Sequence, residues 1–278
     1  MFAELHCHLD GVLDTALAAE LGLGVELPRV RTLADWELYS ARVAQLPDRA
    51  RWLPRVLERH VARLREQRVS YAELFVSGVL FVHPDEAALV DYFAELRAIA
   101  TAAVELVICV GRGTPERLAR QVPRIAALRR AGLICGVAFA GDEAHPIRPL
   151  ARSIAELREL GLGIEIHAGE LAGPESVRDA IEHGSPDRLG HALSAFGDRE
   201  LEDLIASRGI HVELCPSSNL ALSGRSGVER AQQLGISFSI NTDDPGAFGC
   251  TLASELALAQ VAPAAVFDHA MRAAFRGR

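Results

Sequence analysis

Eight short apolar segments recur along the 278-residue chain, and longer amphipathic segments separate them. Val, Ile, Leu and Phe dominate the short segments, as expected for parallel strands that are buried on both faces. The expected strands are Phe2–His8, Tyr71–Ser77, Val104–Val110, Leu133–Ala140, Leu162–His167, Arg188–His191, Ile210–Cys215 and Ser237–Asn241. This alternation predicts an α/β chain with a single (β/α)8 TIM barrel, and an open doubly wound sheet is the alternative.

The segments between the expected strands have the periodicity of helices. In Leu53–Leu64, for example, apolar residues recur about every 3.6 positions. Further helices are expected at Glu86–Ala100, Pro115–Ala131, Leu150–Leu160, Glu175–His183, Arg199–Ser207 and Gly227–Leu234. A barrel of this kind takes about 250 residues. We therefore expect residues 1–278 to form one domain.

The segment Gly22–Asp48 lacks a clear helical or strand pattern and follows the first expected strand. It is long for a connection between a strand and a helix. An insertion at the mouth of a barrel is a candidate lid. Trp36 and Tyr39 lie in it and are candidates to cover a bound ligand, although packing against the barrel helices explains them equally well.

Composition narrows the environment and the partners. The formal net charge is −8, which argues against the phosphate backbone of a nucleic acid as the main partner. The apolar runs are shorter than the roughly 18 residues of a membrane span, and no basic leader precedes an apolar segment. The five cysteines show no CxxC spacing, which is typical of free thiols in a reducing compartment. These features predict a cytoplasmic protein without a membrane partner.

Titratable residues cluster at the ends of the expected strands. In a (β/α)8 barrel the catalytic groups lie at the C-terminal ends of the strands. Scattered surface charge has no reason to select these positions. Five of the eight ends carry such residues: His6-Cys7-His8, Gly141-Asp142-Glu143, His167-Ala168-Gly169-Glu170, Gly190-His191 and Asn241-Thr242-Asp243-Asp244-Pro245.

Four of these residues form a plausible metal site. His6 and His8 are two apart on a strand, so both point to the same face. Alone, such a pair is at least as often a hydrogen-bonded pair in a core. His167 adds a third nitrogen from another strand end, and Asp243 adds an oxygen. Three imidazoles and one carboxylate suit a zinc ion that keeps a position open for water.

Other polar residues at the strand ends complete a candidate catalytic site. Glu170 follows His167 by three residues and is placed to handle protons. His191 offers a further base, and Asp244 offers an acceptor beside the metal site. The chain has no lysine, which excludes two-metal hydrolases that bridge their metals with a carboxylated lysine. We therefore expect one metal ion per chain.

Five motifs span residues 4 to 245. They are Glu4-Leu-His-Cys-His-Leu-Asp-Gly11, His167-Ala-Gly-Glu170, Arg188-Leu-Gly-His191, Cys215-Pro-Ser-Ser-Asn219 and Asn241-Thr-Asp-Asp-Pro245. In this order they resemble the motifs of the adenosine deaminase family within the amidohydrolase superfamily. The chain is identified as a short, divergent member of that family.

The resemblance implies a role for each matching residue. The zinc ligands would be His6, His8, His167 and Asp243. Glu170 would donate a proton to ring nitrogen N1 of a purine, and His191 would orient the attacking water.

The resemblance also implies three contacts to a purine substrate. Asp10 would accept a hydrogen bond from a ribose hydroxyl, Gly141 would contact N3 through its backbone, and Asp244 would contact N7. Relatives specific for adenine tend to carry Glu in place of Asp10 and Asp in place of Gly190. The expected function is therefore zinc-dependent hydrolytic deamination of a 6-aminopurine, with adenosine or a modified adenosine favoured.

Two alternatives remain open from the sequence. The first is a deaminase of adenine or of another aminopurine or N-heterocycle. The second is a non-catalytic relative that binds a nucleoside, although binding alone requires no proton donor such as Glu170. The sequence does not fix the oligomeric state.

Overall fold

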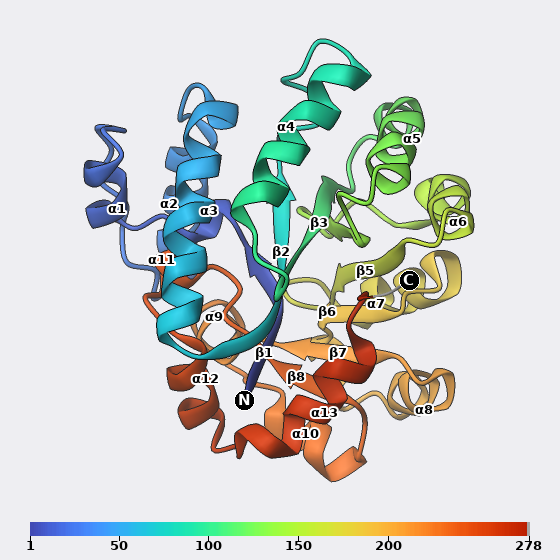
Figure 1. The fold of residues 1–278 in the computed structure, drawn as a ribbon. Coiled ribbons are helices and arrows are strands. Elements are labelled where there is room, and N and C mark those ends of the chain that lie inside the picture. Colours follow the sequence, from blue (N-terminus) through green and yellow to red (C-terminus); the bar gives the residue numbers. More distant parts are fainter. Residues whose placement is uncertain (277–278) are drawn as a thin grey trace.

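The computed structural model describes residues 1–276 and confirms the barrel (Figure 1). Eight parallel strands are hydrogen-bonded in chain order, and an isolated bridge between Cys7 and Asp243 connects the last strand end to the first strand. The strands are β1 (Phe2–His8), β2 (Val69–Ser77), β3 (Val104–Gly111), β4 (Gly136–Ala140), β5 (Gly163–Ala168), β6 (Arg188–His191), β7 (His211–Leu214) and β8 (Phe238–Ile240).

Helices surround the strands (Figure 1). The seven predicted from periodicity are present, with ends shifted by a few residues: α3 (Arg49–Glu66), α4 (Glu86–Ile99), α5 (Pro115–Arg130), α6 (Ala151–Glu159), α7 (Pro174–Asp179), α8 (Arg199–Arg208) and α10 (Val228–Leu234). The expected helix Glu175–His183 is divided, because a π-helical turn over Ala180–Gly184 follows α7. Additional helices are α1 (Thr15–Glu20), α2 (Leu33–Ala44), α9 (Pro216–Ser223), α11 (Pro245–Phe248), α12 (Leu252–Ala259) and α13 (Pro263–Ala273).

The insertion after β1 is more ordered than the sequence suggested. Most of its second half is α2, which begins at a capping box formed by Thr32 and Asp35. The rings of Trp36 and Tyr39 stack with 5.9 Å between their centroids. The hydroxyl of Tyr39 also donates to the carbonyl of Leu13, which anchors the helix beside the end of β1. A function of this segment as a lid stays a prediction.

The inside of the barrel holds buried charged side chains and a small apolar cluster that includes Phe75, Val107 and Ala138, whereas the space between strands and helices is apolar. On β5, Ile164 and Ile166 belong to the hydrophobic core, while Glu165 and His167 alternate with them. On β1, His6 is fully buried, and the thiol of Cys7 points toward α3, 3.5 Å from His60 Nε2. The side chains of His6 and Cys7 thus point in opposite directions, as expected for neighbours on a strand.

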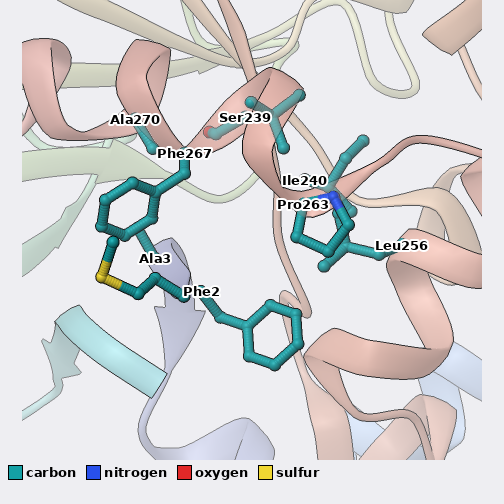
Figure 2. A pocket seen from close by; sticks show the side chains of 10 residues that line it. Phe2, Ala3, Ser239, Ile240, Leu256, Pro263, Phe267 and Ala270 are labelled. Carbon is teal, nitrogen blue, oxygen red and sulfur yellow. The ribbon is translucent and has the colours of Figure 1, made fainter. Parts of the chain in front are cut away.

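The N-terminal end of the barrel is closed by α13, which packs against β1 and β8. Figure 2 shows Phe267 and Ala270 of this helix beside Phe2 and Ala3 of β1. They surround a void of about 10 Å³, which has room for no more than a water molecule. This apolar pocket is a packing feature.

Two further expectations concern the environment of the chain. All five cysteines are free thiols in the structure. Within residues 1–276, no helix combines the length and the apolar character that a membrane crossing requires.

Candidate active site

A cavity of about 1120 Å³ opens at the C-terminal ends of the strands. Its wall includes residues of α2 and α3, the end of β3 and the loops that follow β2, β4 and β5. All but one of the residues predicted for the site line it: His8, Asp10, Gly141, His167, Glu170, His191, Asp243 and Asp244. The exception, His6, is fully buried.

The predicted metal ligands converge at the floor of this cavity. His8 Nε2 lies 3.1 Å from His167 Nε2. Asp243 Oδ1 lies 3.3 Å from His6 Nε2 and 3.5 Å from His8 Nε2. His191 is also close, since His6, His167, His191 and Asp243 each place one ligand atom within 4.8 Å of the others. Five candidate donors therefore surround one point.

The chemistry of these donors fits a metal ion. His6 Nε2 is buried and has no hydrogen-bond partner within residues 1–276. Burial lowers the pKa of His8 to about 3 and holds the pKa of His167 well below its usual value, so both rings are neutral. Neutral imidazole is the form that binds metal. A cation at this point would satisfy lone pairs that otherwise face one another, and a set of three nitrogens and one oxygen suits zinc.

Buried carboxylates orient two of these histidines. Glu213 Oε2 lies 2.7 Å from His6 Nδ1, and Glu165 Oε1 lies 3.0 Å from His167 Nδ1. Such contacts fix the ring so that Nε2 faces the metal position. The side chain of Arg188 is 2.6 Å from Glu213 and 2.7 Å from Glu73, and all three are fully buried. The supporting roles of Glu73, Glu165 and Glu213 were not predicted, although a charged residue inside an apolar strand is an available signal.

Asp243 adopts an unusual backbone conformation. Its φ of 60° lies in the left-handed region, which costs a non-glycine residue about 1–3 kcal/mol. Hydrogen bonds to β1 hold it there: its amide donates to His6, and its carbonyl accepts from the amide of His8. The same backbone contacts that bring β8 and β1 together therefore aim this carboxylate at the histidines.

Glu170 and His191 face each other beside the metal position. The distance from His191 Nε2 to Glu170 Oε1 is 3.7 Å. Burial raises the pKa of Glu170; His191 opposes this shift, and the carboxylate of Asp243 reinforces it. The Nδ1 atom of His191 lies 2.8 Å from the side-chain oxygen of Asn219, the last residue of the Cys-Pro-Ser-Ser-Asn motif. The rise in the pKa of Glu170 is in the direction that a proton donor requires.

The loop that carries Glu170 is held by Glu143. The carboxylate of Glu143 accepts hydrogen bonds from the amides of residues 169–172 and from the hydroxyl of Ser176. Glu143 belongs to the strand end Gly141-Asp142-Glu143, and the sequence predicted no specific function for Glu143 itself. Its contacts identify it as a support for the loop after β5.

The residues predicted to contact substrate lie around the same cavity. Asp10 forms an ion pair with Arg49, in which Arg49 Nη1 is 2.5 Å from Asp10 Oδ2. Asp244 is buried, and burial together with Asp243 and Asp10 holds its pKa well above the usual value. Gly141 has a φ of 98°, a conformation that side chains rarely adopt. The structure thus brings all three predicted contacts to one cavity.

The barrel and its buried cluster of histidines and carboxylates define a metal-dependent hydrolase of the (β/α)8 class. Comparison with known proteins gives the family. The family model described as adenosine deaminase matches residues 2–276. The chain belongs to the adenosine deaminase family, whose members are hydrolases that act on purines.

Individual relatives agree with this assignment. An adenine deaminase of Sinorhizobium fredii is 31% identical over 280 residues, covering 92% of this chain and 86% of the relative. An aminodeoxyfutalosine deaminase of Acidothermus cellulolyticus is 28% identical over 300 residues, covering 95% and 84%. The crystal structure of an adenine deaminase from Arthrobacter aurescens has a TM-score of 0.80 at 18% identity, covering 99% and 94%, which shows the shared fold.

Proposed function

We propose that the chain is a zinc-dependent hydrolytic deaminase of a 6-aminopurine nucleoside, adenosine or a modified adenosine. One observation carries the proposal: the donors of His6, His8, His167 and Asp243 surround one point beside Glu170 and His191 at the floor of a large cavity. One zinc ion per chain would bind there. When bound, zinc lowers the pKa of a coordinated water toward about 7 and supplies a nucleophile at neutral pH.

The side chains around that point suit the steps of deamination. Glu170, whose pKa is raised by burial, donates a proton to N1 as water adds to C6, and ammonia then leaves. His191 orients the attacking water and stabilises negative charge on its oxygen; Asn219 holds its ring. The raised pKa of Asp244 favours a carboxyl group that can donate a hydrogen bond to N7. The backbone of Gly141 contacts N3.

Two features support a nucleoside over a free base. The cavity of about 1120 Å³ is larger than the roughly 300–1,000 Å³ that accommodates drug-sized ligands, so it has room for a sugar beside the base. Gly190 has no space for the aspartate that adenine-specific relatives tend to carry. A Cβ there would lie 2.6 Å from Glu165 Oε1 and 3.0 Å from His6 Cε1. Deamination of adenine is the second candidate, since several relatives about 30% identical are named adenine deaminases.

A substrate panel with one variant tests the proposal. Ammonia release is measured with adenosine, 2′-deoxyadenosine, adenine and other 6-aminopurines. We expect adenosine or a modified adenosine to have the highest kcat/KM. Asp10→Ala should lower kcat/KM for nucleosides far more than for adenine, because only nucleosides lose a charge-assisted hydrogen bond. Equal losses for adenosine and adenine would favour the free-base candidate.

A further inference from the structure

The ion pair between Arg49 and Asp10 joins two segments that are far apart in the sequence. Asp10 follows β1, and Arg49 is the first residue of α3. The side chains of Arg49 and Asp10 are 16% and 19% exposed, respectively, and both line the cavity. Arg49 belongs to none of the family motifs quoted above. Its position therefore adds a cation to the wall of the site that the motifs do not provide.

The surroundings of Arg49 are shaped to hold it. Its guanidinium carbon lies 5.4 Å from the centre of the Trp52 ring. On another side it passes Gly78, where a Cβ would lie 3.1 Å from Arg49 Cδ and 3.3 Å from Nε. Gly78 also has a φ of 73°, which side chains rarely adopt. A larger residue at this turn would displace the guanidinium.

The loop behind Gly78 is itself fixed. Arg124 of α5 donates hydrogen bonds to the carbonyls of Leu80, His83 and Asp85, at 2.8–3.0 Å. These bonds hold residues 80–85 against α5. The path of the Arg49 side chain past Gly78 is therefore a built feature of the cavity wall.

The pair leaves hydrogen-bonding groups for a ligand. Within residues 1–276, the hydrogen bonds of these two side chains use only Nη1 of Arg49 and Oδ2 of Asp10. A guanidinium has five N–H donors and a carboxylate has about four acceptor sites. The pair can therefore both donate to and accept from sugar hydroxyls, which are donors and acceptors at once. A free base has no such group to offer.

We propose that Arg49 is a specificity-determining residue, which holds Asp10 toward the substrate and favours an aminopurine that carries a sugar over the free base. The inference rests on the proposed deaminase function. Electrostatics also support the inference. Asp10 shares the cavity with the acidic residues Asp243 and Asp244, so a nearby cation stabilises its negative charge. Within residues 1–276, Arg49 is the only cation in ion-pair contact with Asp10.

The test compares Arg49→Met and Arg49→Lys with the wild type on adenosine and adenine. Arg49→Met should lower kcat/KM for adenosine about 10- to 100-fold, mostly through KM, as expected for a lost charge-assisted contact. The loss for adenine should be at least about tenfold smaller. Arg49→Lys should restore part of the preference, because it keeps the charge but loses the planar fork.

Arg59→Met is the matched control, because Arg59 also lies on α3 but is half exposed and pairs with Glu20. Arg59→Met should leave kcat/KM for adenosine and for adenine unchanged. Equal losses for adenosine and adenine in Arg49→Met, or no loss for adenosine, would overturn the inference while leaving the deaminase proposal intact.

Calorimetry with inosine and hypoxanthine measures the same preference without turnover. A wild type that deaminates no aminopurine would contradict the proposed function. If Arg49→Met then weakened the binding of inosine but not that of hypoxanthine, the result would still support the Arg49–Asp10 pair as a contact to the sugar. A wild type that binds neither compound would overturn both proposals.

Discussion

The guanidinium of Arg188 lies over the ring of Phe275, with 3.5 Å between the guanidinium carbon and the ring centroid. Both side chains are fully buried. The amide of Phe275 donates to Glu73, and Arg188 donates to the carbonyl of Ala273. Because Arg188 also contacts Glu213, which holds His6, the end of α13 is connected to the floor of the active site.

The first prediction concerns this connection. Phe275→Leu keeps an apolar side chain but removes the aromatic face under Arg188. The affinity for zinc should fall about tenfold, the lower end of what lost supports of metal ligands cost. Competition with a chelator of known affinity measures it. Cobalt substitution gives a second readout, since the visible spectrum should change with the position of His6.

Phe93→Leu is the control for a general loss of packing. Phe93 is equally buried but lies in α4, in the outer layer of the barrel. Both variants should lose roughly 1–2 kcal/mol of stability, whereas only Phe275→Leu should weaken zinc binding. The connection to His6 would be wrong if the two variants bound zinc equally well.

Most of the site could be predicted from the residues at the strand ends. The barrel fold brings the ends of all strands together, so His6, His167 and Asp243 meet although they are far apart in the sequence. Their supports were harder to predict. Glu165 and Glu213 lie inside strands, and their partners depend on strand order and side-chain direction. Arg49 could not be predicted either, because it comes from a helix outside every motif and its contact depends on loop geometry.

The secondary structure, too, could be predicted only in part. Periodicity identified most of the long helices, but not α13 or α2, and the start of α2 depends on the capping box of Thr32 and Asp35. It also missed the short helices that begin with a proline, α9 and α11. Short helices depend on tertiary packing more than on propensity, so a single sequence contains little signal for them.

The second prediction separates the two histidines that compete for a place among the metal ligands. We expect about one zinc ion per chain, bound through His6, His8, His167 and Asp243. His8→Ala should weaken zinc binding by at least about 100-fold, more than the loss of a supporting residue. His191→Ala should keep its zinc but lose turnover. Elemental analysis and chelator competition decide between the two outcomes.

The opposite pattern, with zinc lost from His191→Ala and kept by His8→Ala, would exchange their roles. It is a real alternative, because His191 belongs to the group of donors within 4.8 Å of one another. Two metal ions per chain, or none after expression with added zinc, would contradict the site altogether.

The third prediction concerns the stability of the fold at low pH and its dependence on Glu143. Burial opposes ionisation of Glu143, but hydrogen bonds from Ser176 and from the amides of residues 169, 171 and 172 outweigh it and lower the pKa of this carboxyl below 4.5. A lowered pKa adds stability above the unfolded value, and that stability is lost as pH falls through the folded value. The wild type should therefore lose stability below about pH 4.5.

At neutral pH, Glu143→Gln should have a free energy of unfolding about 1–3 kcal/mol below that of the wild type, the worth of hydrogen bonds to a charged group. Its free energy of unfolding should also decrease less than that of the wild type as the pH falls. Urea unfolding between pH 7 and pH 3 measures both effects, with a chelator present throughout so that metal release does not contribute. Glu156→Gln is the control, since Glu156 is 43% exposed and, within residues 1–276, forms an ion pair only with Arg152. Identical pH profiles for wild type and Glu143→Gln would contradict the prediction.

The last prediction separates proton transfer from metal binding at Glu170. Glu170→Gln keeps the size of the side chain but removes its exchangeable acid. Turnover should fall by on the order of 10²–10⁴, the usual worth of a positioned acid or base. Zinc content and the affinity for inosine should stay near those of the wild type. Glu175→Gln, at an exposed position in α7, should change neither turnover nor zinc content.

The pH profile adds a second readout for Glu170. Burial raises its pKa, so the protonated donor persists above the usual range of a carboxylic acid. Wild-type kcat should decrease as pH rises through this raised pKa, and the residual activity of Glu170→Gln should lack that decrease. If the variant instead lost its zinc while its metal-loaded fraction kept full activity, Glu170 would be a support of the metal site. Ser218, whose hydroxyl lies 3.4 Å from the Glu170 carboxylate, would then have to be tested as part of another route for the proton.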